Sequence, residues 1–314
     1  MSKVACIGEC MIELRQTSGT GLSRGYGGDT LNSAVYLARL GLRVDYITAL
    51  GDDPISEEMV VAWAAEGVGT GLVARLPGKL PGLYMIQTDE AGERRFYHWR
   101  ESSAVRSLMS LPQTAEILDA LTGYDLVYLS AITLSLYDES GRRRLIAALD
   151  RARGRSVRIA FDTNFRARGW PDLEIARRAY QDAFEIADIV LASTEDMSAL
   201  YPGENSDQLL ARMPGGEAVM KLAEPACIVR FAGSSRLVEA GPVRDTVVDT
   251  TAAGDSFAAA YLAARLGGAD PVDAAQAGHR LAGAVVCHRG AIIPLTAMPD
   301  CILSGPAAPN EESA

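Results

Sequence analysis

The sequence predicts an α/β fold, a three-layer α/β/α arrangement with a mostly parallel central sheet and a small β lid. Short apolar runs alternate with amphipathic helical segments along most of the chain, and strands separated by helices form parallel sheets with both faces covered. One early pair of β-prone runs breaks this alternation and indicates the lid. The 314 residues are 48% hydrophobic, which supplies a large core.

The first part of the chain alternates between strands and helices. In the helix predicted at 30–40, Leu31, Ala34 and Val35 share one face. The flanking strands are expected at 4–8 and 43–50, with a second helix at 54–66. Two β-prone runs, 83–88 and 95–100, then flank a turn-like Asp-Glu-Ala-Gly at 89–92. The lid is therefore expected from about residues 9–16 and 80–104.

The alternation returns after the lid and continues almost to the end. Strands are expected at 126–130, 159–162, 189–192, 219–221, 227–231 and 236–239. Helices are expected at 139–153, 173–186, 194–201, 255–266 and 271–286. We expect one domain over residues 1–304 and a frayed tail at 305–314.

Composition argues against several classes of partner. The net charge is −10 and the pI is about 4.9, so the surface should repel nucleic acid and anionic lipid. Five scattered cysteines and three histidines give no zinc-site spacing. Because no segment resembles a signal peptide or a membrane span, we expect a cytoplasmic protein without nucleic-acid or membrane partners.

The most informative stretch is Asp-Thr-Thr-Ala-Ala-Gly-Asp-Ser-Phe at 249–257. Its small residues allow close approach to a ligand, and the first amides of the helix that follows can hold an anion. Asp255 beside that anion could accept a hydroxyl proton, while the amides of Ala252, Ala253 and Gly254 stabilise a transferring phosphoryl group. The alternative is an aspartate that only caps the helix.

At this motif the sequence resembles the ribokinase-like (PfkB) carbohydrate kinases, whose second signature it matches. Gly-Gly-Asp-Thr-Leu-Asn at 27–32 matches the family's first signature, and the resemblance covers roughly residues 4–299. It implies a ribokinase-like fold, ATP as phosphoryl donor, Asp255 as catalytic base, and a sugar site at Gly28, Asp29 and Asn32.

Within the family the sequence is most similar to 2-keto-3-deoxygluconate kinases, on the runs 8–14, 27–32, 80–84, 92–100 and 289–294. This implies phosphorylation of the 6-hydroxyl of a sugar acid whose carboxylate needs cations or hydrogen-bond donors. By resemblance, Tyr84, Tyr97 and Arg100 close over the acid and Arg166 reaches the substrate or phosphates. Strand alternation predicts Tyr97 and Trp99 on one face of the lid and His98 and Arg100 on the other. The resemblance also implies a homo-oligomer formed through the lid.

For the nucleotide, the resemblance implies contacts from Asn164, Lys221, Thr250, Ala252 and Gly254. It places Mg²⁺ near Asp196 and a monovalent cation, K⁺, at Asp249 and Thr251. Two departures stand out. Ser193 replaces the asparagine usual in the family's metal motif, and the loop after Lys221 lacks the usual glycines. We therefore predict weakened ATP affinity before any loss of turnover.

Several alternatives remain open. The chain could phosphorylate another sugar, such as fructose or ribose, or bind nucleotide and sugar without catalysis. A dinucleotide-binding oxidoreductase is disfavoured because no Gly-x-Gly-x-x-Gly follows the first strand. P-loop and protein kinases are disfavoured because their motifs are missing.

Overall fold

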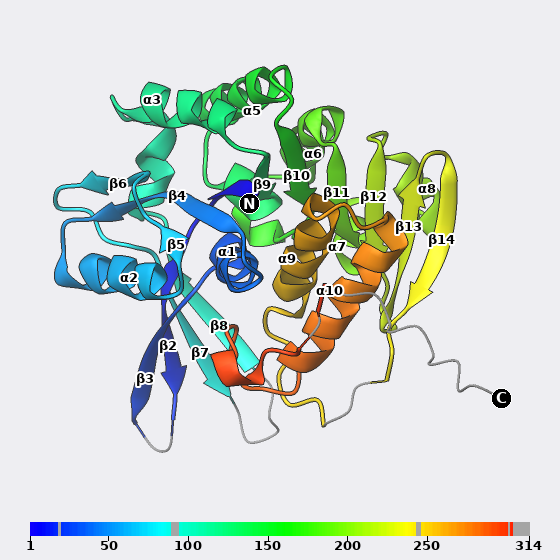
Figure 1. Cartoon of the computed structure of the whole chain (residues 1–314). Helices are drawn as coiled ribbons and strands as arrows, with labels where there is room; N and C mark the ends of the chain where they lie inside the picture. Colours follow the sequence, from blue (N-terminus) through cyan, green and yellow to red (C-terminus); the bar gives the residue numbers. More distant parts are fainter. Residues whose placement is uncertain (18–19, 89–93, 243–245, 301, 304–314) are drawn as a thin grey trace.

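The computed structural model describes residues 1–17, 20–88, 94–242, 246–300 and 302–303. A mostly parallel main sheet runs through the described part of the chain in the order β14-β13-β12-β11-β10-β9-β1-β4-β5, with β6 beside β4 (Figure 1). The pairs β12–β13 and β13–β14 are antiparallel. The strands are β1 (Lys3–Ile7), β4 (Arg43–Gly51), β5 (Val68–Gly69), β6 (Val73–Leu76), β9 (Leu126–Ser130), β10 (Arg158–Asp162), β11 (Ile189–Ser193), β12 (Glu217–Lys221), β13 (Ala226–Phe231) and β14 (Ser234–Glu239).

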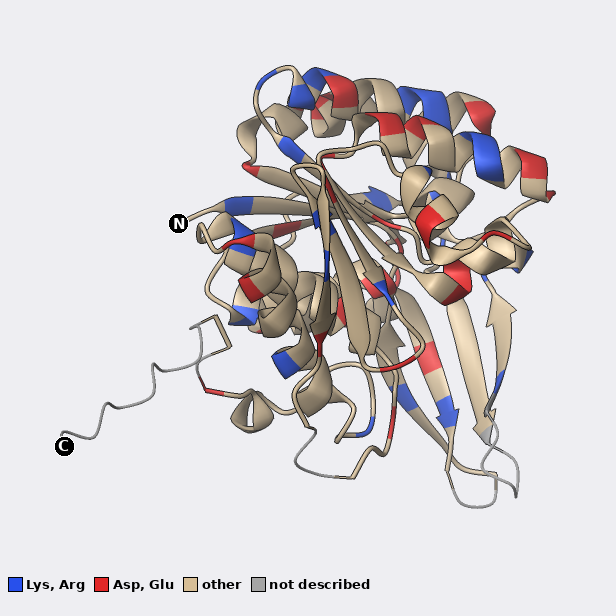
Figure 2. Cartoon of the chain, turned by 90° about the vertical axis from the view of Figure 1, so that its right-hand side faces the viewer, with Lys and Arg blue, Asp and Glu red and all other residues tan. Residues whose placement is uncertain are grey.

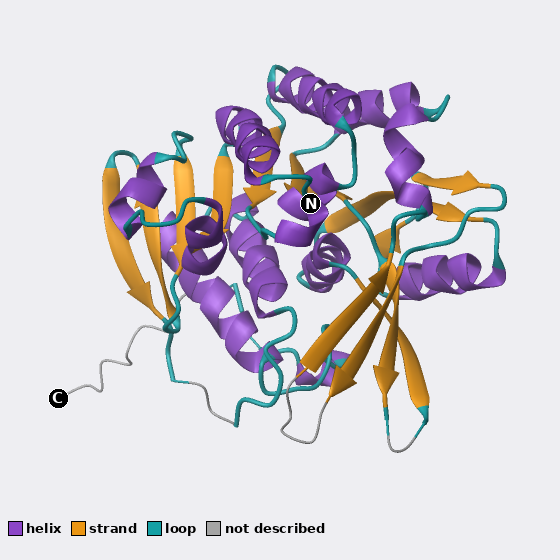
Figure 3. Ribbon diagram, turned by 180° about the vertical axis from the view of Figure 1, so that it is seen from behind, coloured by secondary structure: helices purple, strands orange, loops and turns teal. Residues whose placement is uncertain are grey.

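Helices cover both faces of the main sheet, as Figure 3 shows from behind. One face carries α1 (Asp29–Arg39), α2 (Pro54–Ala65), α9 (Ala253–Leu266) and α10 (Pro271–Val285). The other carries α3 (Thr114–Asp119), α4 (Ala131–Ser135), α5 (Glu139–Arg153), α6 (Leu173–Ile186), α7 (Thr194–Leu200) and α8 (Ser206–Ala211). Short 3-10 helices lie at Ala104–Ser110, Ala120–Gly123, Ala167–Gly169 and Leu295–Ala297.

Alternation along the strands builds the two cores. In β1, Ala5 and Ile7 face the α5 side, whereas Val4 and Cys6 face the α1 side. Because β1 is buried on both faces, it reads as a continuous apolar run. The predicted three-layer α/β/α fold is confirmed.

A second sheet, the lid sheet, projects away from the main sheet at the lower left of Figure 1. Its strand order is β3 (Leu22–Gly27), β2 (Met11–Gln16), β7 (Leu83–Thr88) and β8 (Arg94–Trp99). The pair β2–β7 is parallel, and β2–β3 and β7–β8 are antiparallel. The strand β3 was not predicted from the sequence, and the predicted turn at 89–92 lies outside the described residues.

Charge is distributed without a one-sided basic face on the outer helices. Figure 2 shows acidic and basic residues interspersed along the helices at the top of that view, which include α5 and α6. None of the helices in the described ranges combines the length and apolar character needed to cross a membrane. The predicted tail at 305–314 lies outside those ranges.

Candidate functional site

The start of α9 has the backbone geometry expected of an anion site. Ala252, at the N-cap, adopts φ 60° and ψ 16°, a left-handed conformation that costs a residue with a Cβ about 1–2 kcal/mol. No side chain caps this helix, so the amides of Gly254 and Asp255 are left for an outside partner. The amide of Ala253, expected to help hold the phosphoryl group, instead donates to the carbonyl of Thr250 at 3.3 Å. The side chain of Thr250 itself is exposed.

Asp255 lies in the first turn of α9 and contacts the glycine motif near the N-terminus. The amide of Asn32 donates to its carboxylate at 2.8 Å, and the hydroxyl of Ser33 donates to its carbonyl at 3.0 Å. Burial, followed by the negative charge of Asp29, raises the pKa of Asp255 to about 7. A carboxyl group with that pKa is poised to exchange a proton near neutral pH.

Two predicted site residues from different motifs meet beside Asp255. The amide of Asn164, two residues beyond β10, donates to Asp29 at 2.7 Å. This contact connects Asn164, predicted as a nucleotide ligand, with the predicted sugar motif. Gly28 is needed because a Cβ there would stand 2.1 Å from the carbonyl oxygen of Glu9.

Lys221 lies over the first turn of α9, where a nucleotide phosphate would bind. Its ammonium group is 3.4 Å from the position that a Cβ on Gly254 would take, and 3.4 Å from a carboxylate oxygen of Asp162. Burial raises the pKa of Asp162, whereas the charge of Lys221 lowers it. Asp162 was not predicted, although its place at the carboxyl end of a predicted strand is a recognisable signal.

Asp196, predicted to lie near Mg²⁺, does not belong to a ready-made set of metal ligands among the described residues. Its carboxylate accepts from the hydroxyl of Thr163 at 3.2 Å and lies 3.4 Å from the guanidinium of Arg166. Its backbone amide donates to the hydroxyl of Ser193, which starts α7. Among the described residues, no three His, Cys, Asp or Glu side chains form a metal-binding group. These residues fit a Mg²⁺ ion carried mainly by phosphates and water.

The lid sheet separates two residues that we expected to act together. Tyr84 pairs with His98 across β7 and β8, and their rings stack at 6.0 Å, whereas Tyr97 pairs with Met85. Because successive residues of a strand point to opposite faces, Tyr97 lies on the face opposite Tyr84. This corrects the expectation that Tyr84 and Tyr97 close over the same sugar.

The face with Tyr84 and His98 is the one turned toward the start of α9. The hydroxyl of Tyr84 donates to Glu13 of β2. Arg15, two residues further along the same face, reaches Asp249 with a nitrogen–oxygen distance of 3.6 Å. Sequence reasoning gave His98, Glu13 and Arg15 no site role, since alternation identifies faces but not which face is turned inward.

The two arginines predicted to bind the substrate, Arg100 and Arg166, occupy different settings. Arg100 forms an ion pair with the buried carboxylate of Glu9. The pKa of His98 is lowered by burial and by the positive charges of Arg100 and Arg168, so cationic groups gather on this side of the lid sheet. Arg166 is 61% exposed and points to Asp196. Arg168 was not predicted as a site residue.

Asp249 and Thr251, predicted to hold a monovalent cation, bind each other. One carboxylate oxygen of Asp249 accepts from the amide of Thr251 at 3.0 Å and from its hydroxyl at 2.6 Å. The other oxygen accepts from the amide of Gly290 at 3.0 Å. The carboxylate therefore organises the loop that leads into α9.

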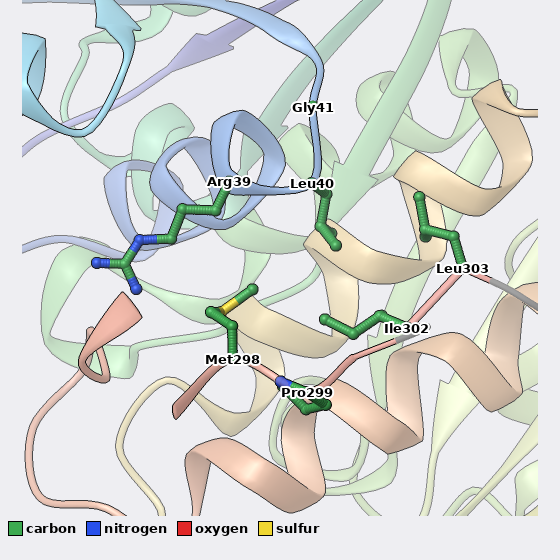
Figure 4. Close-up of a pocket in the computed structure, with 7 residues that line it drawn as sticks. All are labelled: Arg39, Leu40, Gly41, Met298, Pro299, Ile302 and Leu303. Atoms are coloured by element: carbon green, nitrogen blue, oxygen red, sulfur yellow. The ribbon is translucent and has the colours of Figure 1, made fainter. Parts of the chain in front are cut away.

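An open cavity of about 410 Å³ lies elsewhere, at the end of α1 (Figure 4). Its guanidinium group, on Arg39, is already bound to Glu66 and to the carbonyl of Ile293. The lining is otherwise Leu40, Gly41, Met298, Pro299, Ile302 and Leu303. Such a lining offers no acid–base pair, so this cavity plays no part in the site at α9.

The family model, the similar proteins and the similar structure below are all carbohydrate kinases. Residues 1–298 match the model of the pfkB family carbohydrate kinases. The chain is 45% identical over 306 residues to a 2-dehydro-3-deoxygluconokinase of Dickeya dadantii, covering 94% of this chain and 98% of that protein. It is 42% identical to the Escherichia coli K12 protein of the same name, covering 95% and 99%. A crystal structure of 2-dehydro-3-deoxygluconokinase from Thermotoga maritima superposes with a TM-score of 0.81 at 23% identity, covering 93% and 96%.

Proposed function

This chain belongs to the pfkB family of carbohydrate kinases, and we propose that it phosphorylates the 6-hydroxyl of 2-keto-3-deoxy-D-gluconate. The same sugar acid, also written 2-dehydro-3-deoxygluconate, gives its name to relatives 42–45% identical over nearly the whole chain. Sugar kinases of this family use ATP with Mg²⁺. We propose a single kinase domain at 1–304 with the lid sheet closing over the sugar. The cytoplasmic location stays a prediction.

In the proposed reaction, the sugar lies beside Gly28, Asp29 and Asn32, with its 6-hydroxyl at Asp255. The oxygen of that hydroxyl forms a bond to the γ-phosphorus as the bond from phosphorus to the β-phosphate oxygen breaks, and ADP leaves. Asp255 takes the hydroxyl proton and later returns it to water. The first amides of α9 and the ammonium of Lys221 stabilise charge on the transferring group. Asp196 would help to hold Mg²⁺, which would neutralise charge on the phosphates of bound ATP.

The observation that carries this proposal is the hydrogen bond between Asn32 and Asp255, 223 positions apart in the chain. It joins the glycine motif, suited to a sugar, to an uncapped helix start, suited to a phosphate.

We expect Asp255→Asn to lower kcat at least about 100-fold, because the general base is lost while the shape is kept. Coupled ADP release measures kcat, and calorimetry should show that MgATP still binds. As a matched control, Asp207→Asn on the solvent side of α8 should leave kcat unchanged. Near-wild-type turnover in the Asp255 variant would reject the assignment.

For the sugar carboxylate, we propose the cationic side of the lid sheet, at His98 and Arg100, in place of Tyr97. Support comes from the shared face of Tyr84 and His98 and from the arginines that lower the pKa of His98. We propose that Arg166, near Asp196, binds the phosphates of ATP.

The substitutions His98→Ala and Arg100→Ala should raise the KM for the sugar acid by about tenfold or more, since each removes a donor to a carboxylate. Tyr97→Ala should change it little. KM values are measured for 2-keto-3-deoxygluconate, fructose and ribose. Fructose or ribose as the better substrate of the wild type would favour another sugar kinase, and no ADP release with any sugar would favour a non-catalytic binding protein.

We also propose that the chain forms a homodimer through the outer face of the lid sheet. Tyr97 and Trp99 share that face and are 40% and 56% exposed, an unusual exposure for large aromatic side chains. Aromatic residues are enriched at protein interfaces.

A further inference from the structure

The lid sheet carries an arginine that contacts the loop preceding α9. In the ion pair of Arg15 and Asp249, a guanidinium nitrogen lies 3.6 Å from a carboxylate oxygen, and the side chains are 26% and 5% exposed. A pair with one member so deeply buried is screened much less by water and salt than a surface pair.

Asp249 is placed to control the geometry of the phosphate site. Its carboxylate holds the amide and hydroxyl of Thr251 and the amide of Gly290, and its own amide donates to the carbonyl of Val286. Thr251 immediately precedes Ala252, whose left-handed conformation directs the first amides of α9. A shift of Asp249 would therefore alter the site where the phosphoryl group is stabilised.

Arg15 is itself held in place from the sugar side. Two of its guanidinium nitrogens donate to one oxygen of Glu13, at 3.3 and 3.2 Å, and the hydroxyl of Tyr84 donates to the other. That hydroxyl stands 2.2 Å from the position a Cβ on Gly27 would take, against the sugar motif. Polar contacts thus run from Tyr84, which packs against the sugar motif, through Glu13 and Arg15 to Asp249 of the phosphate loop.

These contacts disagree with a monovalent cation bound by the side chain of Asp249. Both carboxylate oxygens already receive hydrogen-bond donors, and the guanidinium of Arg15 supplies a positive charge beside them. An alkali ion at this carboxylate would have to displace or repel the arginine.

We propose that Arg15 is a positioning residue that takes the place of the monovalent cation at Asp249 and couples the lid sheet to the phosphate loop. Only the kcat part of its test depends on the proposed kinase function, since the binding of MgADP can be measured without a sugar. Turnover of the wild type should then be independent of K⁺, and an enzyme without the guanidinium should acquire a response to K⁺.

The test compares the wild type, Arg15→Met and Arg15→Lys in potassium chloride and in choline chloride at equal ionic strength. We expect kcat of the wild type to be equal in both salts. Arg15→Met should lose about tenfold in kcat in choline, equivalent to about 1.4 kcal/mol, and regain several-fold in potassium. Arg15→Lys should keep most of the activity. As a matched control, Arg153→Met removes an arginine of α5, away from the lid sheet, which pairs with Asp188, and should leave both values unchanged.

The Kd of MgADP, measured by calorimetry in the same salts, needs no sugar and separates the two proposals. Weaker MgADP binding in Arg15→Met, restored by K⁺, supports the inference even if no sugar acid is phosphorylated. A wild type that is itself strongly activated by K⁺ would overturn it. So would an Arg15→Met enzyme, folded by circular dichroism, with wild-type kcat and Kd in both salts.

Discussion

At the scale of single residues, the proton affinity of Asp255 sets the behaviour of the site with pH. Its pKa is raised to about 7 by burial and by the charge of Asp29, and catalysis requires the ionised form. We expect kcat/KM for the sugar to fall tenfold for each pH unit below about 7. A pH profile of kcat/KM checks this, and a flat profile down to pH 5 would contradict it.

The same carboxyl group links stability to pH. Its folded-state pKa lies above the unfolded value, so the stability that its proton gives is full at low pH and is lost as pH rises through about 7. Asp255→Asn escapes this loss. We expect the free energy of unfolding of the variant to exceed that of the wild type by roughly 2–4 kcal/mol at pH 8 and by much less at pH 4, since each tenfold change in proton affinity is worth about 1.4 kcal/mol. Urea unfolding at both values measures the difference, and a gap that does not vary with pH would argue against it.

The residues of the site were only partly predictable. Asp255, Asn32 and Asp29 lie in motifs whose small residues and acids carry a local signal, and the structure brings them together. Tyr97 and His98 are neighbours in the sequence, and their roles depend on which face of the lid sheet turns inward. The inward face is revealed by contacts such as the ion pair of Arg15 and Asp249, which are more than two hundred residues apart. No local pattern contains such information.

At the scale of elements, α9 and α10 pack at a contact that only glycine permits. A Cβ on Gly278 of α10 would lie 2.7 Å from the ring of Phe257 in α9. That ring is stacked on Tyr261 and meets His279 edge-on, so it has little room to turn away. The start of α9 therefore depends on a close helix pair behind it.

We expect Gly278→Ala to lower the free energy of unfolding by about 1–3 kcal/mol, the usual cost of overpacking. Gly154→Ala at the end of α5 is the control. There the new Cβ would meet only carbonyl oxygens at 3.5 Å, and φ is −60°, so the change should stay within about 0.5 kcal/mol. Urea unfolding measures both. Equal loss in the two variants, or none in either, would remove the packing argument.

Element bounds followed the sequence where periodicity was strong. The helices α5 and α6 have the predicted limits, since their apolar faces and aspartate caps are both local features. The strand β3 was missed because Leu-Ser-Arg-Gly-Tyr-Gly lacks a clear alternation and is stabilised by pairing with β2. The loop after Lys221 closes a tight turn, with the amide of Leu222 bound to the carbonyl of Ala226. Its effect on ATP affinity stays a prediction.

At the scale of the whole molecule, the N-terminal helix α1 joins the sugar motif to the C-terminal part of the chain. α1 reaches α9 through Asn32 and Ser33, and reaches the segment after α10 through Tyr36 and Arg39, which donate to the carbonyls of Ala291 and Ile293. The sugar and phosphate motifs are therefore held as one unit on the same face of the main sheet. The lid sheet stands outside this unit and exposes its aromatic outer face.

We expect that exposed face to set the oligomeric state. Trp99→Arg places a charge on it and should convert a dimer into a monomer, because burying an unpaired charge in an apolar contact is costly. Leu237→Arg on β14 is the matched control, since Leu237 is 59% exposed and Trp99 is 56% exposed. Light scattering after size exclusion gives the mass of each form. A dimer that persists in Trp99→Arg, or a wild type that is monomeric at micromolar concentration, would contradict dimerisation through the lid sheet.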